Sequence, residues 1–444
     1  MTTRTDAGSV QNPTAAANRH RPGAARHIVD VVATAGLGGF FFDDQAAVKA
    51  GARRDGYSYT GTPLTPGYAA IREPAEAASV MVILDDGYVA VGDCASVQYS
   101  GVGGREPRIN AAQLATTIES VLAPRLRGLD VSAFRSACTQ TEDVIADIPG
   151  LGRAAAYGLS QALLDAAAHT AGHHIMGRVI MDEWNLPGAL APVPLYGQTG
   201  EDRRVGVDKM VLKHVPVLPH GLINTPALVG AQGQALVDYI AFIRERIARL
   251  SQRSDYLPVL HLDVYGQVGV VAEGSIARTA DILTRLEDAA GPHALRIEHP
   301  LDAGSRDAQI EALGALRTEL AARGSQVAII ADEWANTVDD ITAFVSAQAV
   351  DMIQIKTPDL GSLHHIVDAI GVCKAGGVGP FIGGSCTETD RSAHATTHIG
   401  IATGVTQMLA KPGMGIDEGL TIVVNEMHRA VRLDQRYLLM RSPA

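Results

Sequence analysis

ALRIEHP, at residues 294–300, is one of eight short apolar segments that recur along the second part of the chain and decide its fold. The others are PVPLYGQ (192–198), KMVLKH (209–214), PVLHLDV (258–264), QVAIIADE (326–333), DMIQIKTP (351–358), GPFIGG (379–384) and QMLAKP (407–412). Several are separated by helical stretches with an apolar residue every three or four positions, such as Leu236, Ile240 and Ile243. Alternating strands and helices indicate a parallel sheet, and eight strands match a (β/α)₈ barrel. The sequence therefore predicts an α/β fold with a barrel over residues 186–444, with a doubly wound open sheet as the alternative.

The N-terminal part has a different order of elements. HIVDVVAT (27–34) predicts a strand, and SVMVILDDGYVAVGDC (79–94) predicts two strands that turn at Asp86 and Gly87. Three helical stretches follow, around 110–125, 131–147 and 153–171. We therefore expect an α+β domain over residues 27–185. Residues 1–26 have no apolar segment of the kind found in secretory signals, and we expect a disordered tail there.

The composition excludes several classes of protein. No run of eighteen or more apolar residues predicts a membrane span, and the net charge of -11 argues against a nucleic-acid surface. The four cysteines lack CxxC spacing, which gives no indication of a zinc site or a disulfide framework. The chain also lacks a complete dinucleotide-binding, P-loop or GxSxG motif. We expect a cytoplasmic protein that acts on a small molecule and binds neither nucleic acid nor membrane.

Three predicted barrel strands carry a carboxylate at or near the carboxyl end: Asp263, Glu298 and Asp332. Their spacings, 298 − 263 = 35 and 332 − 298 = 34, are about the length of one β/α unit, so the three should converge at one mouth of the barrel. Each alone could instead cap a helix. Together they form an all-oxygen set that suits Mg²⁺ better than zinc. His261 shares a strand face with Asp263 and is expected to pack or to support a ligand, whereas His220 could be catalytic or simply a hydrogen-bonded loop residue.

The next strand carries a lysine on its inner face. Strand alternation places Gln354 and Lys356 on one side and Ile353 and Ile355 on the other, so the amide and the amine should point into the barrel. Burial and a nearby divalent cation would lower the pKa of Lys356 from about 10.4 towards neutrality, which makes it a candidate general base. The alternative is an inward salt bridge between Lys356 and one of the same carboxylates.

Longer motifs resemble those of the methylaspartate ammonia-lyases, carbon–nitrogen lyases of the enolase superfamily. These motifs are DCASVQYSGVGGR (93–105), QTGEDR (198–203), VLPHGLIN (217–224), HLDVYG, RIEHP, ADEWANTVDD, QIKTPDLG, GGSCTETDRSA and LAKPGMGIDEG, and the resemblance runs from about His27 to about Arg432. It implies an enolase-type α+β capping domain on a (β/α)₈ barrel, a homodimer, and Mg²⁺ together with K⁺ as a monovalent activator.

The resemblance also implies a mechanism. Asp263, Glu298 and Asp332 would hold Mg²⁺, which binds the substrate carboxylate. Lys356 corresponds to the base that removes the C3 proton of threo-3-methylaspartate, after which the metal-stabilised enediolate expels ammonia to give mesaconate. The family implies a place in glutamate degradation, and a biosynthetic or assimilatory role is equally compatible with these residues. A Lys or His base with magnesium is a general enolase-superfamily pattern. His220 matches a second acid/base on the opposite face of the substrate.

Seven further positions match substrate-binding positions of the family. Contacts to the carboxylates and amino group correspond to Gln98, Gln198, Gln354, Ser385 and Cys386, and the apolar wall around the methyl group corresponds to Tyr196 and Leu409. The chain departs from the family at Ser385, where Thr is common, at His299, where Gly is usual, and at Tyr196, where Phe is familiar. A Tyr196 hydroxyl in the methyl pocket would shift the preference towards a different 3-substituent.

Other functions remain open from the residues alone. An enolase-superfamily dehydratase or racemase would use the same metal and bases on a related carboxylic acid. A Schiff-base aldolase built on Lys356 would need no metal, and a non-catalytic barrel would keep the site only for structure.

Overall fold

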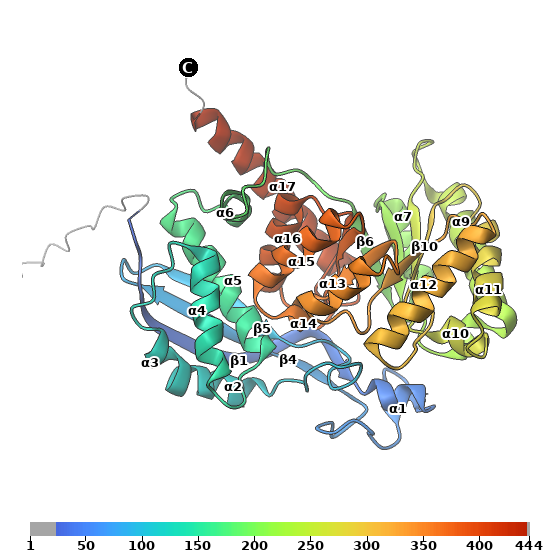
Figure 1. Ribbon diagram of the computed structural model, residues 1–444, viewed down its shortest axis with the longest axis horizontal. Coiled ribbons are helices and arrows are strands. Elements are labelled where there is room, and N and C mark those ends of the chain that lie inside the picture. The colour runs from blue at the N-terminus through green and yellow to red at the C-terminus, as the bar shows by residue number, and fades with distance from the viewer. Residues whose placement is uncertain (1–23, 442–444) are drawn as a thin grey trace, which may run out of the picture.

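The computed structural model describes residues 24–441, which form an antiparallel sheet with helices beside a parallel barrel (Figure 1). The sheet has the order β1 (Ile28–Asp43), β4 (Arg72–Leu84) and β5 (Val89–Ala95). The chain turns between β4 and β5 at Asp86 and Gly87, and Gly87 has the positive φ of 86° that suits a tight turn, so the predicted hairpin is confirmed. The predicted tail at 1–26 lies outside the described residues, except for its last three positions.

Helices between residues 111 and 183 pack either on this sheet or on a helix that contacts it. They are α2 (Ala111–Thr117), α3 (Ala123–Leu126), α4 (Phe134–Ala146), α5 (Arg153–Thr170) and α6 (Met176–Glu183), with a π-helical turn, Ile118–Leu122, between α2 and α3. The Ala-rich α5 is buried on nearly all sides because it contacts the sheet on one side and barrel helices on the other. Small residues allow this close approach: a Cβ at Gly92 of β5 would overlap the carbonyl oxygen of Gly158.

A short segment between β1 and β4 reaches from the sheet to the barrel. It contains α1 (Gln45–Lys49) and a hairpin of β2 (Arg53–Asp55) and β3 (Ser58–Thr60). Lys49 forms an ion pair with Asp302, and Arg54 pairs with Glu201; these acids follow barrel strands. The N-terminal part therefore extends over the carboxyl ends of the barrel strands.

The barrel is closed and consists of eight parallel strands. They are β6 (Leu195–Gly200), β7 (Val217–Gly221), β8 (Val259–Asp263), β9 (Leu295–Glu298), β10 (Ala328–Ala331), β11 (Met352–Ile355), β12 (Gly379–Ile382) and β13 (Gln407–Leu409). Each pairs with its sequence neighbours, and β13 pairs with β6 to close the ring. The predicted (β/α)₈ barrel with an N-terminal α+β capping domain is confirmed, and the open sheet is excluded.

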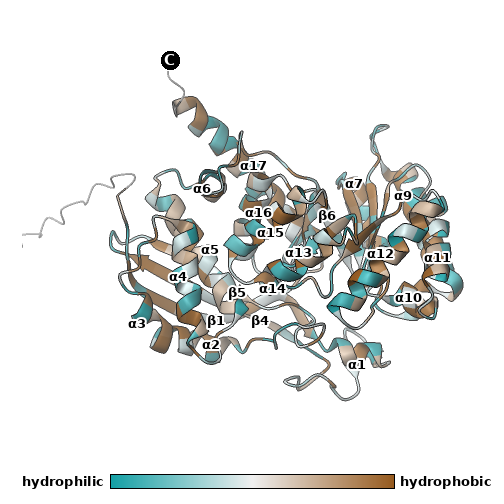
Figure 2. Cartoon of the chain, in the orientation of Figure 1, coloured by the Kyte–Doolittle hydropathy of each residue, from teal (hydrophilic) through white to brown (hydrophobic). Residues whose placement is uncertain are grey.

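Helices surround the barrel. The longer ones are α7 (Arg203–Leu212), α9 (Gln234–Leu250), α11 (Ile276–Ala290), α12 (Arg306–Ala322), α13 (Val338–Ser346), α15 (Leu363–Ala375), α16 (Asp390–Thr403) and α17 (Ile416–Arg441), and the short ones are α8 (Pro226–Val229), α10 (Gln267–Val271) and α14 (Thr357–Leu360). Figure 2 shows apolar strands and helices that mix polar and apolar residues, as expected where one helix face packs on the barrel. Within residues 24–441, no helix has the length and apolar character needed to span a membrane.

One predicted barrel strand is wrong. KMVLKH, at 209–214, lies mostly in the helix α7, whose N-cap Asp202 accepts a hydrogen bond from the backbone N–H of Val205. Its buried residues Val207, Met210 and Val211 follow the three- and four-residue spacing of a helix. The strand at this place in the barrel is β7, which contains His220.

Candidate active site

Three carboxylates converge at the carboxyl ends of neighbouring strands. Asp263 ends β8, Glu298 ends β9, and Asp332 follows β10 directly. One oxygen from each lies within 4.8 Å of an oxygen from each of the others, and all three side chains are buried. Burial and mutual repulsion raise the pKa of Glu298 well above its usual value, and burial with the nearby Glu333 raises the pKa of Asp332 to about 6. Such a set needs positive charge, and its all-oxygen chemistry fits Mg²⁺.

Two cationic side chains of the protein lie beside Asp332. The Lys356 Nζ is 2.7 Å from Oδ1 of Asp332, and a guanidinium nitrogen of Arg105 is 3.5 Å from the same oxygen. Arg105 also approaches Glu333 at 3.5 Å and donates a hydrogen bond of 2.7 Å to Asp359. Arg105 comes from the capping domain and was not predicted as a site residue, although it is the last residue of the motif DCASVQYSGVGGR.

The surroundings of Lys356 decide its protonation. Burial and the nearby Arg105 lower the pKa of Lys356, but Asp332 and Glu333 outweigh them, so that its pKa is raised. The expected lowering is therefore not produced by the protein groups alone. A cation bound among the carboxylates would offset the negative charge that raises the pKa of Lys356.

His220 lies across the barrel from Lys356. It belongs to β7, whereas Lys356 follows β11, and these strands occupy opposite sides of the eight-stranded ring. The His220 Nε2 is 3.4 Å from Oδ2 of Asp263. A molecule held between the two strands would therefore meet an amine on one face and an imidazole on the other.

A cavity lies between these two residues at the interface of barrel and cap. Of the residues predicted for the site, those lining it are Gln98, Gln198, His220, Asp263, Gln354, Lys356, Ser385, Cys386 and Leu409. The lining also includes residues that were not predicted: Val97, Tyr99, Arg105, Tyr265, Phe381, Gly384 and Met414. Polar groups therefore converge on a pocket that also has apolar walls, which suits a small polar molecule with an apolar substituent.

The amide side chains of the pocket are held by neighbouring groups. Gln354 donates a hydrogen bond to Glu298, and Gln198 donates to the carbonyl oxygens of Ala410 at 3.1 Å and Gly413 at 3.0 Å. These bonds fix both amides at the edge of the cavity. Their remaining carbonyl oxygens can accept hydrogen bonds, such as those of an ammonium group.

The capping domain supplies Gln98, which links the two parts of the molecule. Its side chain donates a hydrogen bond of 2.8 Å to Asp43, and its backbone N–H donates to Ser385 Oγ at 2.9 Å. The Cys386 thiol donates to the side-chain amide oxygen Oε1 of Gln98 at 3.3 Å. The loop after β12 is thus joined directly to the cap, so closure of the pocket depends on both domains.

Tyr196 lies outside the cavity lining. Its ring stacks on His261 with centroids 4.1 Å apart, and its hydroxyl donates a hydrogen bond of 3.0 Å to the His261 carbonyl oxygen. It belongs to the packed interior of the barrel with Phe381 and Leu409, which do line the cavity. The hydroxyl therefore points to the backbone of β8. This differs from the prediction from the sequence, which placed the hydroxyl in the pocket.

Two histidines support the acidic residues. Gln407 Nε2 donates to His261 Nδ1 at 2.8 Å, which leaves the His261 Nε2–H to donate to Glu298, also at 2.8 Å. His299 has a left-handed φ of 48°, which explains why glycine suits this position, and its ring lies 3.1 Å from Glu333. The ring of His299 thus packs against Glu333, beside Asp332.

A second lysine, which is fully buried, fixes the loop after β12. Lys411 Nζ donates to Thr357 Oγ1 at 2.7 Å and to Glu388 Oε1 at 2.8 Å, and Glu388 also accepts a hydrogen bond from the Tyr157 hydroxyl. A Cβ at Gly384 would overlap both Lys411 and Glu388, so only glycine fits there. This network holds the loop that carries Ser385 and Cys386.

Comparison with known proteins gives a consistent result. The family model described as methylaspartate ammonia-lyase N-terminus matches residues 26–185, and the corresponding C-terminal model matches residues 188–436. Methylaspartate ammonia-lyase 1 of Carboxydothermus hydrogenoformans is 48% identical over 411 residues, which cover 92% of this chain and 97% of the relative.

Solved structures agree with this. The Citrobacter amalonaticus methylaspartate ammonia lyase containing (2S,3S)-3-methylaspartic acid is 46% identical, with a TM-score of 0.89 over 92% of this chain and 100% of that one. The magnesium complex of β-methylaspartase from Clostridium tetanomorphum is also 46% identical, with a TM-score of 0.87 over 93% of this chain and 100% of that one.

Proposed function

Because the chain belongs to the methylaspartate ammonia-lyase family, a family of carbon–nitrogen lyases, we propose that it eliminates ammonia from threo-3-methylaspartate to give mesaconate in a Mg²⁺-dependent reaction. One observation carries the proposal: a buried triad of carboxylates lies at the barrel mouth, and the pocket lined by Asp263 of this triad has a lysine and a histidine on opposite sides. Elimination of this kind needs charge stabilisation at a substrate carboxylate together with a base at the adjacent carbon.

Asp263, Glu298 and Asp332 would hold the Mg²⁺. Bound there, the ion supplies positive charge to the substrate carboxylate next to the carbon that loses its proton. The proposal is supported by the all-oxygen donor set, by the raised pKa values of Glu298 and Asp332, and by the magnesium complex of a related enzyme. His261 positions Glu298 through its hydrogen bond of 2.8 Å.

Lys356 would remove the proton from C3. It lies on the pocket side of its strand, and it can accept a proton only after losing its own. Arg105 favours that loss because a second positive charge nearby lowers the pKa of Lys356. His220, across the pocket, would serve as the second acid/base and could act on the other diastereomer.

The remaining contacts would bind the rest of the substrate. We assign the carboxylates and the amino group to the hydrogen-bonding groups of Gln98, Gln198, Gln354, Ser385 and Cys386. Leu409 and Phe381 form an apolar part of the lining, which suits a methyl group. Because the Tyr196 hydroxyl is bonded to backbone, we propose that it supports this wall from behind and does not alter the 3-substituent accepted.

The test is ultraviolet detection of mesaconate from threo-3-methylaspartate in the presence of Mg²⁺ and K⁺. Product that disappears when EDTA is added and returns with Mg²⁺ supports the proposal. Absence of product from a folded protein that binds Mg²⁺ would contradict it, and hydroxy acids assayed in parallel would reveal a dehydratase or racemase.

We also propose K⁺ as an activator, a role in glutamate degradation and a homodimer, all on the basis of the family. Replacing K⁺ by a bulky monovalent cation such as tetramethylammonium should lower turnover.

The end of α17 projects from the body of the molecule (Figure 1) and exposes Leu433, Leu439 and Met440, which a second copy could cover in the homodimer. Sedimentation should give twice the chain mass of 46.6 kDa; a species of 46.6 kDa would refute the dimer.

A further inference from the structure

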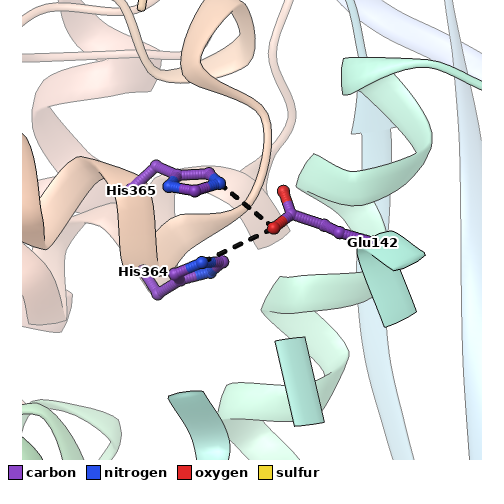
Figure 3. Close-up of side chains that lie close together, drawn as sticks. All are labelled: Glu142, His364 and His365. Carbon is purple, nitrogen blue, oxygen red and sulfur yellow. Dashed lines mark hydrogen bonds and ion pairs between the residues drawn. The ribbon is translucent and has the colours of Figure 1, made fainter. Parts of the chain in front are cut away.

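A second group of metal-binding side chains lies away from the barrel mouth. Glu142, on α4 of the cap, faces His364 and His365 in the first turn of the barrel helix α15. Figure 3 shows both imidazoles turned towards the same carboxylate oxygen of Glu142. The distances from this oxygen are 3.1 Å to Nε2 of His365 and 3.5 Å to Nε2 of His364.

These separations match the spacing of ligands around a small metal ion. In a tetrahedral zinc site with metal–ligand distances of about 2.0–2.2 Å, neighbouring ligand atoms are about 3.4 Å apart. One potential ligand atom from each of Glu142, His364 and His365 lies within 4.8 Å of the other two. An ion could therefore enter with little movement of the side chains.

The orientation of His364 is fixed by a neighbour. Its Nδ1 lies 2.9 Å from Ser362 Oγ, so a proton on Nδ1 leaves Nε2 free to bind a metal towards Glu142. Ser362, directly before α15, and Cys138, one helical turn before Glu142 on α4, are both buried. Both sides of the cluster are therefore anchored in the domain interface.

The cluster is open to solvent on one side. The side chains of His365 and Glu142 are 37% and 28% exposed, whereas that of His364 is 6% exposed. An ion could enter from this side, and water could complete its coordination. Arg135, which would repel a cation, is paired with Asp368 at 3.1 Å, and this pairing offsets part of its charge.

We propose that Glu142, His364 and His365 bind one divalent transition-metal ion of the zinc class at the interface between the cap and the barrel. Two imidazole nitrogens and one carboxylate oxygen select zinc, cobalt or nickel over Mg²⁺, which prefers oxygen ligands. The site is thus chemically distinct from the all-oxygen triad at the barrel mouth.

The position of the site suggests what the ion does. α15 begins seven residues after Lys356 (363 − 356 = 7), and α14 lies between them. An ion held jointly by α4 and α15 fastens the capping domain to the segment that leaves the lysine-bearing strand. Binding should therefore raise the thermal stability of the two-domain protein, because the ion binds the folded and not the unfolded chain.

The experiment compares the wild-type protein with H364N/H365N, and uses H428N as a control because His428 is an exposed histidine outside the cluster. Each protein is freed of metal, returned to excess Mg²⁺ to fill the barrel-mouth site, and titrated with Zn²⁺ by calorimetry. Co²⁺ titrations followed by visible absorption report nitrogen ligation of the ion directly. Thermal unfolding is recorded with and without Zn²⁺.

Wild type and H428N should bind one more equivalent of Zn²⁺ than H364N/H365N, with a Co²⁺ spectrum and a Zn²⁺-dependent rise in Tm that the double variant lacks. Equal stoichiometry in all three proteins would overturn the proposal. If the double variant does not fold, E142Q, which preserves the shape of Glu142, tests the metal site in its place. It should weaken Zn²⁺ binding by about tenfold or more, and unchanged affinity would also overturn the proposal.

Discussion

Two lysines lie at the mouth of the barrel, and their burial and surroundings differ. Lys411, after β13, is fully buried and donates hydrogen bonds to one carboxylate, Glu388, and to Thr357. Lys356, after β11, lines the pocket and lies among the carboxylates of Asp332, Glu333 and Asp359. Burial lowers the pKa of Lys411, whereas the excess of negative charge raises that of Lys356.

The difference separates a structural lysine from a reactive one. Lys411 has a matched partner and no access to the pocket, so its charge serves to hold the loop after β12. The charge state of Lys356 instead depends on what else occupies the space between Asp263, Glu298 and Asp332. A cation there would offset the negative charge that raises the pKa of Lys356, so metal binding and base strength are coupled.

Replacing Lys356 should have the largest effect on turnover. K356A should lower kcat by about 10²- to 10⁴-fold, because it removes a general base and leaves the carboxylates in place. Mesaconate formation measures the loss, and a Mg²⁺-dependent rise in Tm shows that the metal site persists. Turnover equal to that of the wild type would remove Lys356 from the role of base.

Replacing Lys411 should instead affect stability. K411M leaves Glu388 buried without its cation. The free energy of unfolding, measured with urea, should fall by about 3–5 kcal/mol. K411M/E388Q should recover part of this loss, because the uncompensated charge is gone. If K411M unfolds like the wild type but loses turnover as K356A does, the distinction between the two lysines fails.

Mg²⁺ should stabilise the protein in a pH-dependent way. The pKa of Asp332 is raised to about 6 from an ordinary value of about 3.9, so the folded metal-free protein binds this proton more tightly than the unfolded chain does. Stability without metal should therefore fall as the pH rises from about 4 to 6. Mg²⁺ must displace the proton, so its stabilising effect should grow over the same range.

With Mg²⁺ at 100 times its Kd, the free energy of unfolding above pH 6 should increase by about 2.7 kcal/mol. Thermal unfolding at about pH 5 and pH 8, with and without Mg²⁺, measures it, and D332N should weaken the effect at the higher pH. An equal Mg²⁺ effect at both pH values would contradict the coupling.

The smallest effect is expected from the residue between the two lysine sites. T357V removes the hydroxyl that accepts a hydrogen bond from Lys411 and donates one to Glu388. The free energy of unfolding should fall by about 1–3 kcal/mol. Turnover at a temperature where the variant is folded should stay near that of the wild type, although Thr357 is adjacent to Lys356. A fall in turnover without a fall in stability would show that the two networks are not separate.

Much of the fold could be predicted because its signals are local. Short apolar strands, helical stripes and the Asp-Gly turn identified the capping domain and the barrel, and the resemblance to the methylaspartate ammonia-lyases, with its carbon–nitrogen lyase class, is confirmed. KMVLKH misled because a short apolar run suits both a strand and one buried helix face.

The site was predictable where residues lie on the barrel strands and less so elsewhere. The strand positions of Asp263, Glu298 and Asp332 brought them together as expected from their spacing. Arg105 was missed because only the packing of the cap on the barrel brings it to Asp332. The Tyr196 hydroxyl was misplaced because Tyr196 shares an inner face with Gln198 but lies two residues deeper in the barrel, away from the mouth.

Exchange of the C3 proton with solvent tests the central claim most directly, namely that Lys356 and not Lys411 is the base. Proton NMR in D₂O, with threo-3-methylaspartate, Mg²⁺ and K⁺, follows loss of the C3–H signal and appearance of mesaconate. Wild type and folded K411M should deplete the substrate signal, whereas K356A should leave it intact on the same timescale. Depletion by K356A at the wild-type rate would contradict the account.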